Sequence, residues 1–193
     1  MKTLLTLTIA VLLLDACESI TGNRTDHEYK KESIRTIDLT DESKLVMDHT
    51  NGGITITGSE TAQNIVVEMT KRVRSHSLED AKEHIDDIII SEHTHINEVF
   101  VEVEHPGNTG REYQVDFVIV LPAQFEFDLA LGNGGIAIES TEGNISVDLG
   151  NGGVAISAIK GNLAIDLGNG GVEADFIPAD SCDIDINVGN GGI

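Results

Sequence analysis

Two histidines and two glutamates are the residues whose types and spacing could hold a metal ion. His93 and His95 lie two positions apart, which puts both imidazoles on one face of a strand. A structural zinc site needs four ligands and a catalytic one needs three, and Glu92 and Glu98 do not obviously converge on the pair. The spacing therefore favours a solvated strand face, and we assign no metal and no cofactor.

A recurring aspartate is the second candidate for chemistry. Asp148 and Asp166 each precede a Leu-Gly-Asn-Gly-Gly segment, and Asp48 holds the same place before Asn51-Gly52-Gly53. In neighbouring strands the first two carboxylates would lie about 4.8 Å apart, where their repulsion in water is only about 1 kcal/mol. A calcium-binding β-roll places its aspartate after the glycines, not before them. A calcium-dependent β-roll-like module is therefore an alternative and not the favoured interpretation.

A basic cluster, Lys71, Arg72 and Arg74, precedes a predicted helix at 77–87. The helix is expected because Ser77-Leu78-Glu79-Asp80 resembles a capping box, and an apolar stripe follows. We expect the cations to pair with acidic side chains of this helix or to be solvated. A binding patch for an anionic glycan is the alternative.

Residues suited to catalysis do not stand out. The chain has no Trp, and Tyr29 and Tyr113 lie outside the repeats, so a sugar-binding aromatic platform is not evident. The many carboxylates leave a glycan-active β-helix enzyme as an alternative function, because paired acids catalyse glycoside hydrolysis. No pair is singled out, and we predict a protein that is not an enzyme.

A sequence repeat in the C-terminal half predicts the strands that would position these residues. Gly-Asn-Gly-Gly begins at Gly132, Gly150, Gly168 and Gly189, with alternating apolar residues on both sides. A fixed period near 18 residues is typical of repeat architectures. We predict an all-β fold, a parallel β-helix (β-solenoid) with ~18-residue coils and one short helix in its N-terminal half. An antiparallel meander is the alternative, since Asn-Gly is also a hairpin signal.

The predicted repeat turns are Asn51, Gly52, Gly53, Asn133, Gly134, Gly135, Asn151, Gly152, Gly153, Asn169, Gly170, Gly171, Asn190, Gly191 and Gly192. Their asparagines are expected to share side-chain hydrogen bonds.

The N-terminus predicts export and lipidation. A basic start and an apolar run, Leu4 to Leu14, read as a signal peptide over residues 1–16. Leu14-Asp15-Ala16-Cys17 resembles the bacterial lipoprotein signal, which implies lipid attachment at Cys17. We expect a flexible tether over 17–33 and one body over 34–193, with divergent coils at 34–122 and regular repeats at 123–193. Cys182 is expected to point inward.

Charge and family resemblance limit the function. A net charge of −21 argues against nucleic acid as a partner. The Asn-Gly-Gly-(Ile/Val) segments, together with Leu121-Pro122, resemble the bacterial "putative adhesin" family of envelope proteins. That resemblance implies a β-helix-like fold and an extracytoplasmic location.

We therefore predict a non-enzymatic, lipid-anchored structural or binding module of the bacterial cell envelope, with the outer membrane favoured. Its expected partners are the membrane through the lipid, and an envelope protein or a glycan. Self-association through the C-terminal coil edge is also expected.

Overall fold

The structure is a computed structural model that describes residues 27–107, 110–177 and 182–193. Its elements, in chain order, are β1 (His27–Asp38), β2 (Lys44–Ser59), β3 (Asn64–Ser75), α1 (Leu78–Glu83), η1 (Ile85–Asp87), β4 (Ile89–His95), β5 (Glu98–Glu104), β6 (Glu112–Pro122), β7 (Glu126–Glu139), β8 (Ile145–Ile159), β9 (Leu163–Phe176) and β10 (Ile184–Gly192). None of the helices in these ranges has the length and apolarity needed to cross a membrane.

The strands form one open, mixed sheet that branches at β2. The main path runs β1-β3-β6-β2-β7-β8-β9-β10, and β5 joins β2 separately and carries β4. On one side, β7 lies along most of β2. On the other side, β5 pairs with 44–48 and β6 pairs with 54–59. The segment 49–53 lies between these two partners, and this gap in the pairing determines where the groove described below can form.

The predicted parallel β-helix is wrong. In the N-terminal half, β1 pairs antiparallel with β3, β3 with β6, and β4 with β5. The order of strands in the sheet also differs from their order in the chain, so residues 34–122 are not divergent coils. The 18-residue period correctly indicated which residues of neighbouring strands lie side by side. It could not indicate that these strands extend an open mixed sheet.

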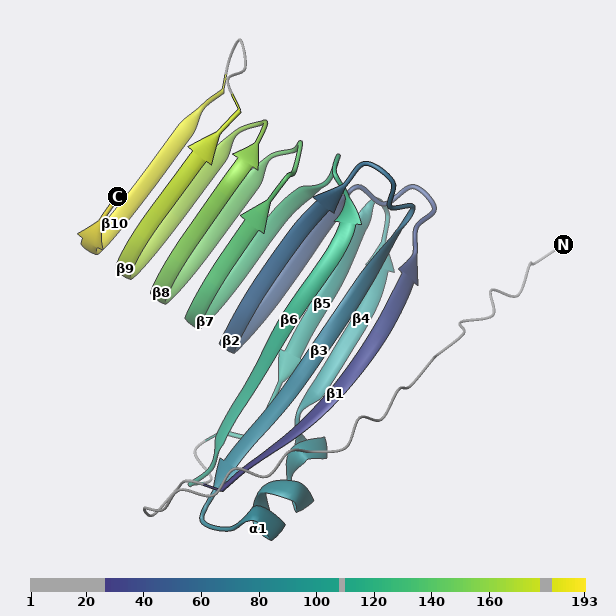
Figure 1. Ribbon diagram of the computed structural model, residues 1–193, viewed down its shortest axis with the longest axis vertical. Helices are drawn as coiled ribbons and strands as arrows, with labels where there is room; N and C mark the ends of the chain where they lie inside the picture. The colour runs from purple at the N-terminus through teal and green to yellow at the C-terminus, as the bar shows by residue number, and fades with distance from the viewer. Residues whose placement is uncertain (1–26, 108–109, 178–181) are drawn as a thin grey trace, which may run out of the picture.

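The repeats themselves do lie side by side in parallel (Figure 1). The register aligns Asn51 with Asn133, Asn133 with Asn151, Asn151 with Asn169, and Asn169 with Asn190. The antiparallel meander is therefore excluded for β7–β10. Residues one repeat apart are lateral neighbours in the sheet.

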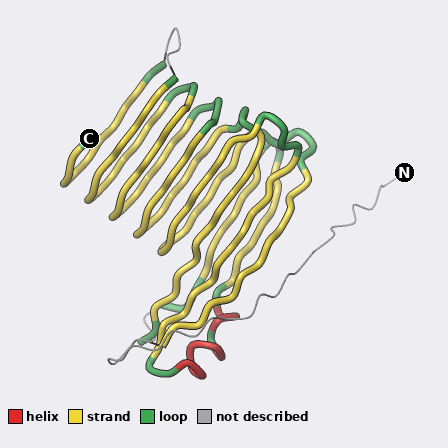
Figure 2. The backbone as a smooth tube through the Cα atoms, in the orientation of Figure 1, coloured by secondary structure: helices red, strands yellow, loops and turns green. Residues whose placement is uncertain are grey.

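The predicted repeat turns are bends within continuous strands. In Figure 2, β2 and β7–β10 are drawn as strand through the bend, and loops join the strands at the opposite end. In β7, Phe127, Leu129 and Leu131 are buried before the bend, and Ile136 and Ile138 after it. The alternation changes phase at Gly-Asn-Gly-Gly because the chain reverses there, so both halves of the strand face one core.

The predicted helix is confirmed as a short α1 followed by η1. The Ser77 side chain accepts a hydrogen bond from the Asp80 amide at 3.1 Å, as a capping residue does. Ala81 and Ile85 are buried, and α1 packs against β1 and β3 at one end of the molecule (Figure 1).

Both ends of the described chain differ from expectation. The strand β1 begins at His27, so residues 27–33 belong to the sheet and not to a tether. Cys182 is exposed and does not point inward as predicted. The strand that follows it, β10, pairs only with β9 among the described strands, so no further strand covers it. Ile184 at the start of β10 is likewise 47% exposed.

Candidate functional site

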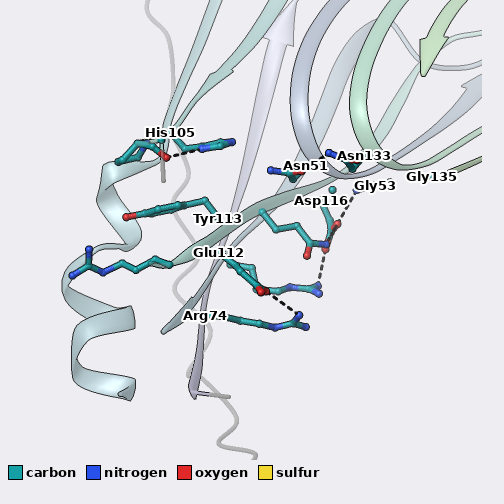
Figure 3. A pocket seen from close by; sticks show the side chains of 16 residues that line it. Asn51, Gly53, Arg74, His105, Glu112, Tyr113, Asp116, Asn133 and Gly135 are labelled. Atoms are coloured by element: carbon teal, nitrogen blue, oxygen red, sulfur yellow. Dashed lines mark hydrogen bonds and ion pairs between the residues drawn. The ribbon is translucent and has the colours of Figure 1, made fainter. Parts of the chain in front are cut away.

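A groove of about 820 Å³ opens where β2 bends. Its floor is formed by the Asn-Gly-Gly bends of β2 and β7, and its walls by β3, β6 and the segment 105–107. Figure 3 shows these side chains converging from elements far apart in the sequence. We call it the bend groove.

Asp116 on β6 connects the wall of the bend groove to its floor. Its Oδ2 accepts a hydrogen bond from Arg72 Nη2 at 2.6 Å. Its Oδ1 accepts from the Gly53 amide and from Gln114 Nε2, each at 2.9 Å. Charge-assisted hydrogen bonds of this kind are short and strong. Both oxygens of Asp116 are therefore committed to holding β3, β6 and the β2 bend together.

Arg74 is the most exposed arginine of the bend groove. Its side chain is 46% exposed, and its Nε donates to Glu28 Oε2 at 2.8 Å. Its Nη1 lies 3.7 Å from Glu112 Oε2, which is beyond hydrogen-bond range. Burial raises the pKa of Glu28, but hydrogen bonds from Lys30 and Arg74 outweigh it and leave the pKa below its ordinary value. Arg74 is thus held by Glu28 through Nε, while Nη1 has the more distant Glu112 as its ion-pair partner.

Arg111 fixes the segment before β6 to the helix. Its Nε and Nη2 donate to the two carboxylate oxygens of Asp80 at 2.7 and 2.6 Å. The same carboxylate accepts a hydrogen bond from Ser75 Oγ. The hydrogen bonds from Arg111, then that from Ser75, hold the pKa of Asp80 far below its ordinary value. This bidentate pair sets the position of one wall.

A pair of stacked rings forms part of that wall. His105 and Tyr113 stack with 5.7 Å between ring centroids and 11° between planes (Figure 3). His105 Nδ1 donates to the Pro106 carbonyl at 3.1 Å, and Tyr113 is 5% exposed. The stacked pair offers a rigid edge to the groove.

A buried histidine lies beneath the floor. His49 is 2% exposed, and its Nε2 donates to the Val115 carbonyl at 2.8 Å. Its ring meets Phe117 edge-on, with centroids 5.4 Å apart. Burial lowers the pKa of His49 below its ordinary 6.5. This contact ties the β2 bend to β6 where no strand pairing does.

The predicted asparagine hydrogen bonds are confirmed, and they run to the edge of the groove. The Nδ2 of each asparagine donates to Oδ1 of the preceding one at 2.8–3.0 Å, from Asn190 through Asn169, Asn151 and Asn133 to Asn51. Asn51 is the last acceptor, so the ladder does not use its Nδ2. That donor lies at the bend groove (Figure 3).

The two glycines after each asparagine serve different purposes. At Gly134, φ is +145° and an added Cβ would lie 1.7 Å from the Gly52 carbonyl oxygen, so only glycine fits. At Gly135 the only neighbour of an added Cβ is the Gly153 carbonyl oxygen at 3.8 Å. The fold therefore does not require glycine at 135, and its lack of a side chain keeps the floor open.

The other predicted residues do not form a site. His93 and His95 are exposed on β4, and His93 stacks on Phe100 at 4.7 Å. Asp148 and Asp166 are exposed neighbours, as their spacing predicts. Within residues 27–107, 110–177 and 182–193, no three His, Cys, Asp or Glu side chains gather to hold a metal. Cys17 lies outside the described residues.

Lys71, Arg72 and Arg74 lie close together on β3, but the prediction that they pair with acidic residues of the helix is wrong for the two arginines. Arg72 and Arg74 pair with carboxylates on neighbouring strands and not with the helix, and Lys71 Nζ donates to the Ile88 carbonyl at 2.6 Å. Sequence reasoning missed Arg111, Tyr113 and Asp116 as members of the site. One signal was Asp116 itself, a charge within the apolar run of β6.

No protein-family model matches the sequence, and no curated protein matches it. Among solved structures, a "putative cell adhesion protein" from Clostridium sporogenes ATCC 15579 matches 85% of this chain and 99% of its own, with 13% identity and a TM-score of 0.37. A "putative adhesin" from Parabacteroides merdae ATCC 43184 matches 84% and 96%, with 8% identity and a TM-score of 0.26. A "putative lipid binding protein" from Parabacteroides distasonis ATCC 8503 matches 84% and 96%, with 9% identity and a TM-score of 0.30. Likeness at this level does not identify a ligand, so the function is inferred from the bend groove itself.

Proposed function

We propose that this chain is a non-enzymatic binding module whose ligand lies in the bend groove. The observation that carries the proposal is that the groove is held in shape by its own contacts. Asp116 joins three elements, and Arg111 fixes the wall through Asp80. A site that is ordered before its ligand arrives loses less entropy on binding, which is what a recognition surface requires.

The same contacts argue against catalysis in this groove. A general acid or base must exchange a proton with the substrate. Asp116 has both oxygens occupied by hydrogen-bond donors, and His49 lies beneath the floor with its Nε2 bound to Val115. Glu112 is 70% exposed at the rim, and among the described residues its ion-pair partner is Arg74 at 3.7 Å. Asp116 and His49 are placed to maintain shape, and Glu112 has no second carboxylate of the lining free to act with it, which supports binding over the glycan-active enzyme.

The location of the module is part of the proposal. Lipidation at Cys17 would tether the sheet to a bacterial membrane, with the outer membrane favoured, and the groove would then face an envelope partner. This part rests on the Leu-Asp-Ala-Cys pattern alone. Globomycin, which blocks cleavage of lipidated precursors, tests it: accumulation of an uncleaved precursor in treated cells is expected, and its absence would refute lipidation.

The groove is tested by filling it without disturbing the fold. Gly135→Leu places a side chain on the floor where an added Cβ meets nothing closer than 3.8 Å. Gly153→Leu is the matched control, because its Cβ has the same 3.8 Å neighbour one repeat away, outside the bend groove.

The assay is binding of the purified chain and both variants to an array of soluble oligosaccharides and unstructured peptides. We expect Gly135→Leu to lose the probes that the native chain retains, while Gly153→Leu keeps them. If the native chain and Gly135→Leu retain the same probes equally, the ligand lies elsewhere and the proposal is refuted.

A further inference from the structure

The bend groove is the place where the positive charge of this acidic chain gathers. The protein has a net charge of −21 and five arginines, of which Arg72, Arg74 and Arg111 line the groove. Only one basic residue, Lys160, follows Arg111 in the sequence. Among the lining residues the two carboxylates are Glu112 and Asp116. Arg72 is paired with Asp116 and Arg111 with Asp80, so Arg74 is the arginine of the groove whose terminal nitrogens are not in a close pair with a carboxylate.

From the position of Arg74 and the acidity of the rest of the chain we infer that the ligand is an acidic saccharide with sparse carboxylates. This inference rests on the proposed function and names its ligand class. The sparse charge follows from the body of the protein. A dense polyanion would be repelled by the −21 charge along its length, whereas a single carboxylate meets only the local field of the arginines.

Arg74 is the group that would bind the carboxylate. Its Nε is held by Glu28, and its terminal nitrogens donate no hydrogen bond to any residue in the described ranges. A guanidinium whose terminal nitrogens have only the 3.7 Å ion pair with Glu112 can exchange that partner for the two oxygens of a ligand carboxylate. Glu112, 70% exposed and 3.7 Å away, lies at the rim and is free to turn away when an anion arrives.

The rest of the lining suits hydroxyl groups. Asn51 has an amide nitrogen that the asparagine ladder does not use, so it offers a donor, and the Glu112 carboxylate offers acceptors. A sugar hydroxyl both donates and accepts. The bare floor at Gly53 and Gly135 lets a flat ring approach the backbone.

A peptide ligand fits less well. Amphipathic-helix and Pro-rich peptides are recognised through apolar side chains that enter hydrophobic or aromatic grooves. Among the described residues, no Val, Leu, Ile, Met or Phe lines the bend groove. Tyr113, its one tyrosine, is already stacked against His105 and 5% exposed. The lining offers no aliphatic pocket for a peptide side chain, and its amide, guanidinium and carboxylate groups suit a saccharide.

The test uses hyaluronan hexasaccharide, in which every second sugar carries a carboxylate, with its carboxyl-reduced form as the neutral probe. Heparin hexasaccharide is the densely charged probe, and an acidic peptide, acetyl-Gly-Glu-Gly-Glu-Gly-amide, is the peptide probe. Binding is measured by calorimetry at 50 mM and at 500 mM NaCl. The chains are the native protein, Arg74→Gln, Arg35→Gln and Gly135→Leu.

Arg35→Gln is the matched control, because Arg35 is 41% exposed and pairs with Glu92 away from the groove. We expect the native chain to bind the acidic hexasaccharide at least tenfold more tightly than its reduced form, and Arg74→Gln to lose about tenfold, since hydrogen bonds to charged groups commonly contribute that much. Arg35→Gln keeps native affinity, and 500 mM NaCl weakens binding because it screens the attraction. Thermal melting of each variant confirms that it is folded.

The outcomes separate the two proposals. Equal binding of the acidic and reduced forms, blocked by Gly135→Leu and unaffected by Arg74→Gln, would overturn the acidic assignment while the groove stays a binding site. Tighter binding of heparin or of the peptide would also overturn it. Binding that Gly135→Leu does not weaken would overturn both proposals, and the absence of binding by every probe would overturn the acidic assignment.

Discussion

Gly134 and Gly135 are adjacent in the bend of β7, and the structure predicts opposite responses when each is replaced by alanine. In Gly134→Ala, the added Cβ would lie 1.7 Å from the Gly52 carbonyl oxygen at a backbone φ of +145°. In Gly135→Ala, the added Cβ meets nothing closer than a carbonyl oxygen at 3.8 Å, at an ordinary φ. The two variants add the same single methyl group, so the comparison isolates backbone geometry.

The expected loss for Gly134→Ala has two sources. An L-residue at such a φ costs roughly 1–3 kcal/mol, and forcing extra atoms into a filled site costs roughly 1–3 kcal/mol more. The free energy of unfolding should therefore fall by about 2–6 kcal/mol. At this chain length each kcal/mol shifts the melting temperature by roughly 2–4 °C, so the expected fall is roughly 4–24 °C.

Gly135→Ala should leave stability unchanged or raise it by about 0.4–1 kcal/mol, because alanine lowers the entropy of the unfolded chain. Thermal unfolding followed by circular dichroism compares the two variants with the native chain. The equivalent pair one repeat later, Gly152 and Gly153, should behave alike, since the corresponding distances are 1.6 and 3.8 Å. If Gly134→Ala melts as the native chain does, or if both alanines destabilise it equally, the assignment of the two glycines is wrong.

Three further predictions follow from the contacts described. Asn151→Ala removes two hydrogen bonds of the asparagine ladder and Asn190→Ala removes one. Denaturant unfolding should therefore show that the free energy of unfolding falls by roughly 1–3 kcal/mol in Asn151→Ala and by roughly 0.5–1.5 kcal/mol in Asn190→Ala. Equal losses in the two variants would argue against these hydrogen bonds as the source. The pKa of His49 is lowered in the fold by burial, so stability should be full above pH 6.5 and fall as the pH drops below it. In His49→Gln the free energy of unfolding should change less between pH 7 and pH 5 than in the native chain. An equal change in both proteins would mean that other groups cause the pH dependence. The pKa of Asp80 is lowered by Arg111, so its contribution to stability is present above the ordinary 3.8 and is lost as the pH falls below it. Unfolding of Asp80→Asn should depend less on pH between 5 and 2, and a dependence equal to the native one would contradict the pairing.

The sequence predicted the parts of the fold that depend on local pattern. Alternation located the strands of the repeats, and the period aligned Asn133, Asn151 and Asn169 as neighbours. Ser77 located the helix start through its capping pattern. These features depend on residues a few positions apart or on an exact repeat, which is why a sequence reveals them.

The architecture and the site could not be predicted this way. The period is the same whether parallel strands wind into a solenoid or extend a mixed sheet, and the antiparallel pairing of β3 with β6 depends on partners 38 or more residues apart. Arg72 meets Asp116 across 44 positions, and Asn133 meets Asn51 across 82. Nothing in the local pattern of either partner indicates the other.

Because the sheet branches at β2, the length of the repeat array and the shape of the bend groove depend on different strands. On one side of β2, two different strands meet around the bend groove, and on the other side each repeat adds one strand in unbroken register. Adding or removing an 18-residue unit such as 145–162 would lengthen or shorten the body by about 4.8 Å and leave the residues around the bend groove in place. The length of the repeat array can therefore change independently of the residues that line the groove.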